Sequence, residues 1–188
     1  MKKLMLLSIT LFALAQLLNA QSQRPKKNYL DLNAGMGMLP TFVKDAGKVK
    51  TPPLSLTADY QVVEHFSIGA YAGFSVTETD ARALRDGSTA QWSNRFSIFG
   101  LRLAARSSQM GPWNVYGGLS AGYSISKIDM MQGDIEKVKS EKNIRAVSGK
   151  MLMTGFLGGR YSLTPKAGIF GELGYGVSLA TVGLSIRI

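Results

Sequence analysis

The chain contains no cysteine in its 188 residues, which removes a whole group of chemistries from consideration. No disulfide can form, no thiol can act as a nucleophile, and no thiolate can hold a metal ion. Long apolar runs are also missing, because after residue 20 none approaches the roughly 20 residues that a helix needs to cross a bilayer. The rest of the chain therefore offers no transmembrane-helix candidate, and its many glycines are scattered as in close-packed strands.

The first twenty residues have the three parts of a secretory signal peptide. Lys2 and Lys3 supply the positive start, and Leu4 to Leu18 form an apolar stretch that contains Gln16 and is short for a membrane anchor. Ala20 then offers a small residue at the cleavage point. We therefore predict a signal peptide over residues 1–20, a short basic periplasmic leader over 21–28, and one domain over 29–188.

The charge balance is basic, with 22 Lys and Arg against 12 Asp and Glu and a formal net charge of +10. A basic excess is compatible with nucleic acid or with an anionic lipid surface as partner. Because a signal peptide directs the chain out of the cytoplasm, nucleic acid is the poorer candidate. A membrane surface that carries phosphates is the better one.

Eight segments alternate apolar with small or polar residues at a period of two, which is the pattern of β-strands. In the first segment, for example, Leu32 lies on the face opposite to Asp31. The fourth segment breaks the alternation at Phe96 and Ile98, which predicts a bulge near Ser97. The segments are Tyr29–Met38, Leu54–Val63, Phe66–Val76, Ser93–Arg106, Trp113–Ser126, Lys150–Leu163, Gly168–Gly176 and Ala180–Ile188.

The connections between these segments alternate in length. Short ones span residues 63–65, 107–112 and 164–167, and long, charged ones span 39–53, 77–92 and 127–149. Outer-membrane barrels have short periplasmic turns and long extracellular loops in this alternation, although the short connection at 177–179 departs from it. We therefore predict an all-β fold, a closed eight-stranded antiparallel transmembrane β-barrel with both termini periplasmic. A soluble lipocalin-like barrel, with its apolar faces turned inward, is the alternative.

Three glycine-rich stretches, Gly117–Tyr123, Gly171–Gly176 and Val182–Ile188, carry a resemblance to a known family. They are similar to the outer-membrane β-barrel domain of OmpA-like and porin-family small proteins, especially those of Bacteroidota. The resemblance covers essentially the whole mature chain and implies a barrel in the outer membrane of a Gram-negative cell envelope. Two features depart from the family: no peptidoglycan-binding domain follows the barrel, and the last residue is Ile188 instead of an aromatic residue.

The alternation turns seven charged side chains towards the barrel interior. An eight-stranded barrel is only wide enough for side chains to fill it, so we predict a network of carboxylates and guanidiniums that plugs the lumen. Within it, we expect Glu172 to bridge Arg160 and Arg187. Structural ion pairing is one interpretation, and a gate or proton path with exchanging partners is the other. The seven residues are Asp31, Asp59, Arg102, Arg106, Arg160, Glu172 and Arg187.

The opposite face predicts contacts with lipid. Aromatic residues gather near both ends of the strands, as in the aromatic belts at the two membrane interfaces. Near the short turns these are Tyr60, Phe66, Trp113 and Tyr161, and near the long connections Phe74, Tyr123 and Tyr175. Lysines of the long connections are candidates for lipopolysaccharide phosphates, with ordinary solubilising charge as the alternative; they are Lys44, Lys48, Lys50, Lys137, Lys139 and Lys142.

Signals for catalysis or metal binding are weak. The one histidine, His65, falls in a predicted periplasmic turn, and the acidic residues Asp129, Asp134 and Glu136 do not have the spacing of a calcium loop. We expect no enzyme activity and no cofactor. The barrel is predicted to be a monomer with a structural or interactive role, exerted through its charged extracellular loops. A narrow porin-like diffusion channel and a component of an envelope secretion or assembly apparatus are the alternatives.

Overall fold

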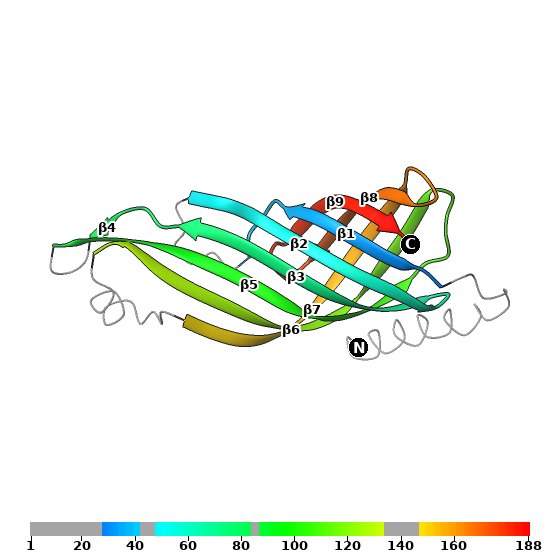
Figure 1. The fold of residues 1–188 in the computed structure, drawn as a ribbon, viewed down its shortest axis with the longest axis horizontal. Helices are drawn as coiled ribbons and strands as arrows, with labels where there is room; N and C mark the ends of the chain where they lie inside the picture. Colours follow the sequence, from blue (N-terminus) through cyan, green and yellow to red (C-terminus); the bar gives the residue numbers. More distant parts are fainter. Residues whose placement is uncertain (1–27, 42–47, 84–86, 134–146) are drawn as a thin grey trace, which may run out of the picture.

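Eight antiparallel strands close into a ring of hydrogen bonds, which confirms the predicted barrel (Figure 1). The structure, a computed structural model, describes residues 28–41, 48–83, 87–133 and 147–188, so the predicted signal peptide lies outside the described residues. The ring runs β1-β2-β3-β5-β6-β7-β8-β9 and closes between β9 and β1, while the short β4 pairs with β5. The strands are β1 (Leu30–Gly37), β2 (Lys48–Val63), β3 (Phe66–Glu78), β4 (Arg82–Ala83), β5 (Thr89–Arg106), β6 (Trp113–Gln132), β7 (Val147–Ser162), β8 (Ala167–Gly174) and β9 (Ala180–Arg187).

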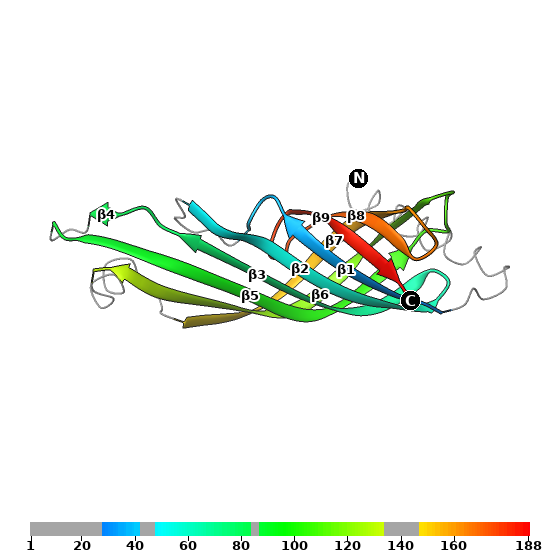
Figure 2. The ribbon, with the colours of Figure 1, turned by 45° about the horizontal axis from the view of Figure 1, so that its top comes forward.

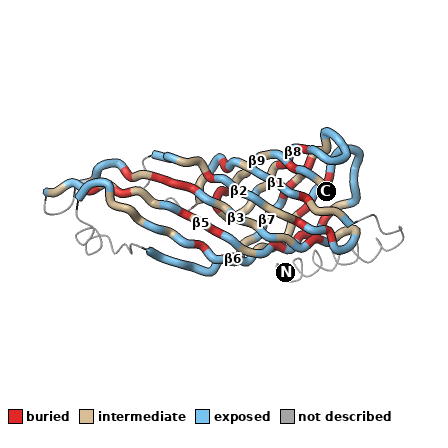
Figure 3. The backbone as a smooth tube through the Cα atoms, in the orientation of Figure 1, coloured by how far each residue is buried: buried red, intermediate tan, exposed pale blue. Residues whose placement is uncertain are grey.

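The two faces of the wall have the polarity of a membrane barrel. Outward-facing Leu56, Leu119 and Leu184 are 62%, 64% and 66% exposed, whereas inward-facing Asp31 and Arg102 are 1% and 3% exposed. Figure 3 shows the resulting alternation of buried and exposed positions along the strands. A soluble barrel places its large apolar residues inside, so the lipocalin-like alternative is wrong.

Five strands are longer than the alternation predicts. For example, β2 begins at Lys48 instead of Leu54, and β6 ends at Gln132 instead of Ser126. By contrast β1, β8 and β9 have only 8 residues each, so the long strands continue as a curved sheet beyond one side of the ring (Figure 2). The strands were missed there because the outward residues turn from apolar to charged while the backbone pairing continues. Much of the sequence expected to form long loops is therefore paired sheet.

The predicted bulge near Ser97 is wrong. β5 pairs without interruption with β3 from Ser93 to Ala105, and its register shift against β6 lies at Gln91 and Trp92. Phe96 and Ile98 keep the inward parity of their strand and are 3% and 2% exposed. They pack with Val177 in a small apolar cluster inside the barrel, which is why apolar residues stand where the alternation predicts polar ones.

The ends of the barrel differ. Glu64 and His65 form the tight turn between β2 and β3, and short connections join β5 to β6 and β7 to β8 at the same end. The chain end lies there too, because Ile188 and Leu30 exchange two backbone hydrogen bonds, of 2.8 and 2.9 Å. No helix in the described ranges is long and apolar enough to cross a membrane. Residues 42–47, 84–86 and 134–146 lie outside the described residues.

Candidate functional site: a charge network inside the barrel

Strand register brings five inward-facing residues into one row across five strands. Arg187 of β9 pairs with Asp31 of β1, which pairs with Asp59 of β2. Asp59 pairs with Gly69 of β3, which pairs with Arg102 of β5. Two carboxylates on neighbouring strands repel each other when they stand directly opposite, so Asp31 and Asp59 need cations close by.

Asp31 is held by two arginines. Arg187 donates from Nε to Oδ1 at 2.8 Å and from Nη2 to Oδ2 at 3.0 Å. Arg106 donates from Nη1 to Oδ2 at 2.8 Å and from its own Nε to Ser67 Oγ at 3.0 Å. The Arg187 guanidinium also lies 3.7 Å from the centre of the Tyr29 ring. Three charge-assisted hydrogen bonds therefore hold this one carboxylate, which is 1% exposed.

Asp59 is held chiefly by charge. Its Oδ1 lies 3.1 Å from Arg102 Nε and its Oδ2 lies 3.6 Å from Arg106 Nη2, yet neither oxygen accepts an aligned hydrogen bond from a described residue. The Arg102 side chain on β5 reaches Asp59 on β2 over Gly69 of β3, the strand that lies between them. A Cβ on Gly69 would stand 2.1 Å from Asp59 Oδ1, so the glycine opens the space in which the pair meets.

Arg102 also reaches the far side of the barrel. It donates from Nη1 and Nη2 to the two oxygens of Glu172 on β8, at 3.3 and 2.8 Å, and its guanidinium lies 3.8 Å from the centre of the Phe156 ring. Tyr116 donates its hydroxyl to Glu172 at 3.3 Å across Gly158, which lies between them in register. A Cβ on Gly158 would stand 2.6 Å from the Tyr116 ring, so a second glycine makes room for a second contact of this kind.

Arg160 differs from the other three arginines. It is 2% exposed, and it donates to the Ser185 and Ser162 hydroxyls at 2.8 and 2.6 Å and to the Lys166 carbonyl at 3.3 Å. The predicted bridge of Glu172 between Arg160 and Arg187 is therefore wrong. Glu172 faces Gly158 and Thr181 in register, and its charged partner is Arg102.

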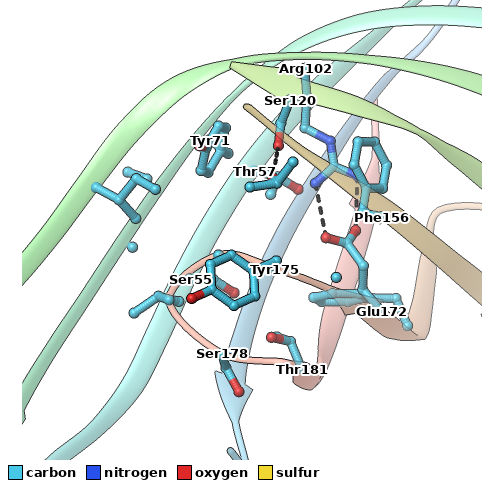
Figure 4. A pocket seen from close by; sticks show the side chains of 18 residues that line it. Ser55, Thr57, Tyr71, Arg102, Ser120, Phe156, Glu172, Tyr175, Ser178 and Thr181 are labelled. Atoms are coloured by element: carbon cyan, nitrogen blue, oxygen red, sulfur yellow. Dashed lines mark hydrogen bonds and ion pairs between the residues drawn. The ribbon is translucent and has the colours of Figure 1, made fainter. Parts of the chain in front are cut away.

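A cavity of about 60 Å³ lies between the network and the β8–β9 connection (Figure 4). The Arg102–Glu172 pair forms part of its wall, and Tyr175 and Val177 of the connection form another part. The connection reaches across the barrel, because Val177 packs with Phe96 and Ile98 of β5. It is also tied to the end of β1, because Ser178 Oγ donates to the Leu39 carbonyl at 2.8 Å and accepts from the Leu39 N–H at 3.1 Å. The interior is thus occupied below the cavity, and the β8–β9 connection lies over part of its mouth.

The aromatic residues expected at the two interfaces fall into three groups. Trp113 and Tyr161 meet edge to face on the outward surface, with ring centres 4.9 Å apart, and Tyr60 and Phe66 are exposed at the same end. At the other end Phe74 and Tyr123 are exposed, and Phe99, which the prediction left out, lies 6.2 Å from Tyr123. Tyr175 corrects the prediction: it stands beyond the end of β8, and its ring lines the interior cavity instead of the outward face.

The loop lysines are only partly described. Lys48 is exposed, and Lys50 forms an ion pair with Glu78 at 2.7 Å. Lys44, Lys137, Lys139 and Lys142 lie outside the described residues, as do Asp134 and Glu136.

The remaining candidates for chemistry have ordinary partners. Asp129 pairs with Arg95 at 3.0 Å, and His65 Nδ1 lies 3.1 Å from the Arg106 carbonyl. Within the described ranges, no three His, Asp or Glu side chains gather as a metal site.

Several interior residues escaped the sequence prediction. The rings of Tyr29 and Phe156 lie against guanidiniums, and the Tyr116 hydroxyl donates to a carboxylate. Arginines donate hydrogen bonds to the hydroxyls of Ser67 and Ser185. Their parity was the one available signal, because residues that alternate with the outward leucines face the interior whether they are charged or not.

Comparisons with known proteins bear on the fold. No protein-family model matches the chain, and a search of curated proteins finds no match either. Among solved structures, Neisserial surface protein A is similar with a TM-score of 0.53 and 12% identity, covering 88% of this chain and 99% of that one. A major outer membrane protein of Thermus thermophilus is similar with a TM-score of 0.51 and 14% identity, covering 87% of this chain and 100% of that one. The attachment invasion locus protein Ail of Yersinia pestis was solved with the heparin analogue sucrose octasulfate. It is similar with a TM-score of 0.50 and 12% identity, covering 86% of this chain and 97% of that one.

At these identities the likeness shows the fold, which is that of small eight-stranded outer-membrane β-barrels. The Bacteroidota type of the family, suggested by the glycine-rich stretches, stays a prediction.

Proposed function

We propose that the protein is an outer-membrane barrel with a closed interior, whose role is structural and interactive at the cell surface. The exposed apolar wall with aromatic residues at both ends supports placement in a bilayer. Both ends of the described chain lie at the end with the short turns, which in this class faces the periplasm. The longer strands then project to the outside of the cell.

The observation that carries the proposal is the continuity of the charge network across the lumen. It runs from Arg187 through Asp31 and Arg106 to Asp59, and from there through Arg102 to Glu172. Aromatic rings cover two of its guanidiniums at 3.7 and 3.8 Å. An eight-stranded barrel has no spare width beside such a layer, so the side chains leave no aqueous path.

Single-channel recording in a planar bilayer tests this proposal. The refolded protein, with heat-modifiable gel mobility shown on the same sample, is expected to insert and to remain electrically silent. A Glu172→Gln variant is expected to stay silent as well, because the amide fills the same space. Discrete current steps from the wild-type protein that change in size in Glu172→Gln would overturn the closed interior.

A narrow channel is the second candidate, and the cavity of about 60 Å³ is the observation that favours it. The cavity ends on the Arg102–Glu172 pair, so exchange of that pair would be the gating step. The same recordings decide between the two candidates.

Lipopolysaccharide phosphates are the partner that we propose for the outward cations. Arg95 and Lys127 stand opposite each other on the outward face, further out along the same strands than the Phe99–Tyr123 contact. Cations just beyond an aromatic belt lie at the level of lipid phosphates, where each basic residue contributes about 1 kcal/mol to binding.

The matching variant is Arg95→Ser with Lys127→Ser. Thermal unfolding in detergent with added lipopolysaccharide is expected to show stabilisation of the wild type and a weaker effect in this variant, by about 2 kcal/mol of binding free energy. Lys166→Ser, an exposed lysine at the opposite end, is the control and should keep the wild-type response. An equal response from both variants would contradict the placement of the phosphates.

A further inference from the structure

The outward wall over β1, β2 and β3 contains two hollows that adjoin each other. One has a volume of about 550 Å³ and the other of about 390 Å³, so each is several times larger than the interior cavity. Both are lined by Ala34, Leu56 and Ala72, which stand in one row of the sheet. Because the hollows share this row, they are continuous along the strands and form a single β1–β3 groove.

The groove exists because small side chains stand on the outward face of these three strands. Four alanines form its floor, and Leu56, which is 62% exposed, rises between them. Leu54 and Phe74 border the outer end of the groove, and Phe74 belongs to the aromatic residues of that end of the barrel. The four alanines are Ala34, Ala58, Ala70 and Ala72.

The length of the groove matches one leaflet of a bilayer. A strand rises about 3.3 Å per residue, so the stretch of β2 from Leu54 to Ala58 covers roughly 13 Å, close to half of a hydrocarbon core about 30 Å thick. Phe74 marks the interface at the outer end, so the groove lies in the outer leaflet. What this part of the wall meets is therefore lipid.

Cations stand on the same strand just outside the groove. Lys48 and Lys50 lie further out on β2 than Leu54, and both are exposed. Lys48 stands opposite Glu78 of β3 in register, and Lys50 forms an ion pair with Glu78 at 2.7 Å. Two cations thus share one carboxylate, which leaves this end of the groove positively charged.

Strand register relates these lysines to the phosphate level proposed above. Thr51 of β2, the neighbour of Lys50, belongs to one row with Arg95 and Lys127, through Val76 of β3. In Figure 1 β1, β2 and β3 lie side by side, and β2 and β3 run on beyond the end of β1. The groove therefore leads from the apolar wall to cations at the level of lipid phosphates.

We propose that the β1–β3 groove holds an acyl chain of a lipopolysaccharide molecule whose phosphate binds Lys48 and Lys50. This deepens the proposed contact with lipopolysaccharide and rests on it, but it lies on other strands than the Arg95–Lys127 pair. Apolar groups inside a membrane gain nothing from leaving water, so close packing and charge decide which lipid stays. A groove of fixed shape with cations at its outer end supplies both, whereas the rest of the wall exchanges its lipids freely.

Native mass spectrometry of the full chain in detergent, titrated with lipopolysaccharide, is the measurement. Ala72→Leu fills the groove and should weaken binding at least about fivefold, which is the lower end of the usual cost of overpacking. Lys48→Ser should weaken it about fivefold, as expected for one basic residue at the phosphate level. Ala121→Leu is the matched control and should keep the wild-type affinity, because Ala121 is exposed on β6 in the same row as Ala70 but outside the groove.

Fully deacylated lipopolysaccharide separates the chain from the phosphate. It should bind the wild type and Ala72→Leu equally, and Lys48→Ser more weakly. A weaker response of Ala72→Leu to this form as well would show a general change in the wall and overturn the role of the acyl chain.

Heat-modifiable gel mobility establishes that the variants fold. Equal affinity of Ala72→Leu and Ala121→Leu for lipopolysaccharide would overturn the groove, even where Arg95→Ser with Lys127→Ser has lost affinity and the proposed partner stands. Displacement of lipopolysaccharide by an equal concentration of phosphatidylglycerol would overturn it too, because the site would then hold any anionic lipid. A wild type that retains no lipopolysaccharide rejects the groove and the proposed partner together.

Discussion

Asp31→Asn is expected to lower the free energy of unfolding by about 3–5 kcal/mol, because it removes one partner of a buried charge cluster. Asp31 accepts three hydrogen bonds from Arg187 and Arg106. An amide accepts on one atom only and turns an NH₂ group towards the guanidinium donors on the other. Both arginines then lose their closest counter-charge, and Asp59, at 3.6 Å from Arg106, replaces only part of it. Denaturant unfolding in phospholipid vesicles measures the change.

The same substitution in an exposed ion pair is the matched control. Asp129 pairs with Arg95 at 3.0 Å, but their side chains are 35% and 55% exposed. Asp129→Asn should therefore cost less than about 1 kcal/mol. Adding Arg187→Met to Asp31→Asn should recover part of the loss, since it removes one of the unpaired cations. Equal costs for Asp31→Asn and Asp129→Asn would show that the network contributes little to stability.

The sequence predicted the faces of the wall well, and the reason is physical. The period of a strand is two, so one outward leucine fixes the direction of every other residue on that strand. Asp31 and Arg102 were placed on the inward face in this way, and the structure finds both there. The same rule failed to place Phe96 and Ile98 only because apolar residues were assumed to face lipid.

Contact partners were harder to predict than directions. The expected partners of Glu172 were sought on adjacent strands, whereas Arg102 lies on β5 and reaches β8 across the barrel. Which residues meet across a lumen depends on the register of every strand in the ring, and a shift of one residue changes all of them. The sequence contains no direct signal for this closure.

Strand ends were missed for a different reason. Outside the apolar belt, the outward residues include Arg95, Lys127 and Asp129, so the contrast between the two faces disappears while the hydrogen bonds continue. A prediction that depends on the difference in polarity between the two faces of a strand therefore ends the strand where the outward residues become charged.

Gly69→Ala is expected to cost about 3 kcal/mol, at the upper end of the usual cost of overpacking. The new Cβ would stand 2.1 Å from Asp59 Oδ1 and 2.5 Å from the Ala58 carbonyl, and a backbone oxygen within a paired sheet has little freedom to move away. The methyl group also fills the space over which Arg102 reaches Asp59, so the ion pair at 3.1 Å is pushed apart. Denaturant unfolding in vesicles measures the loss.

Gly171→Ala is the matched control for that loss, since it places the same methyl group on another strand of the ring where no atom lies within 4 Å. Its effect should stay within about 0.5 kcal/mol, as for surface substitutions, and should favour the folded state because alanine restricts the unfolded chain. If the two variants lost equal stability, glycine would matter to these strands through backbone conformation alone. A large loss confined to Gly69→Ala would instead show that the glycine is needed because a carboxylate and a guanidinium meet over it.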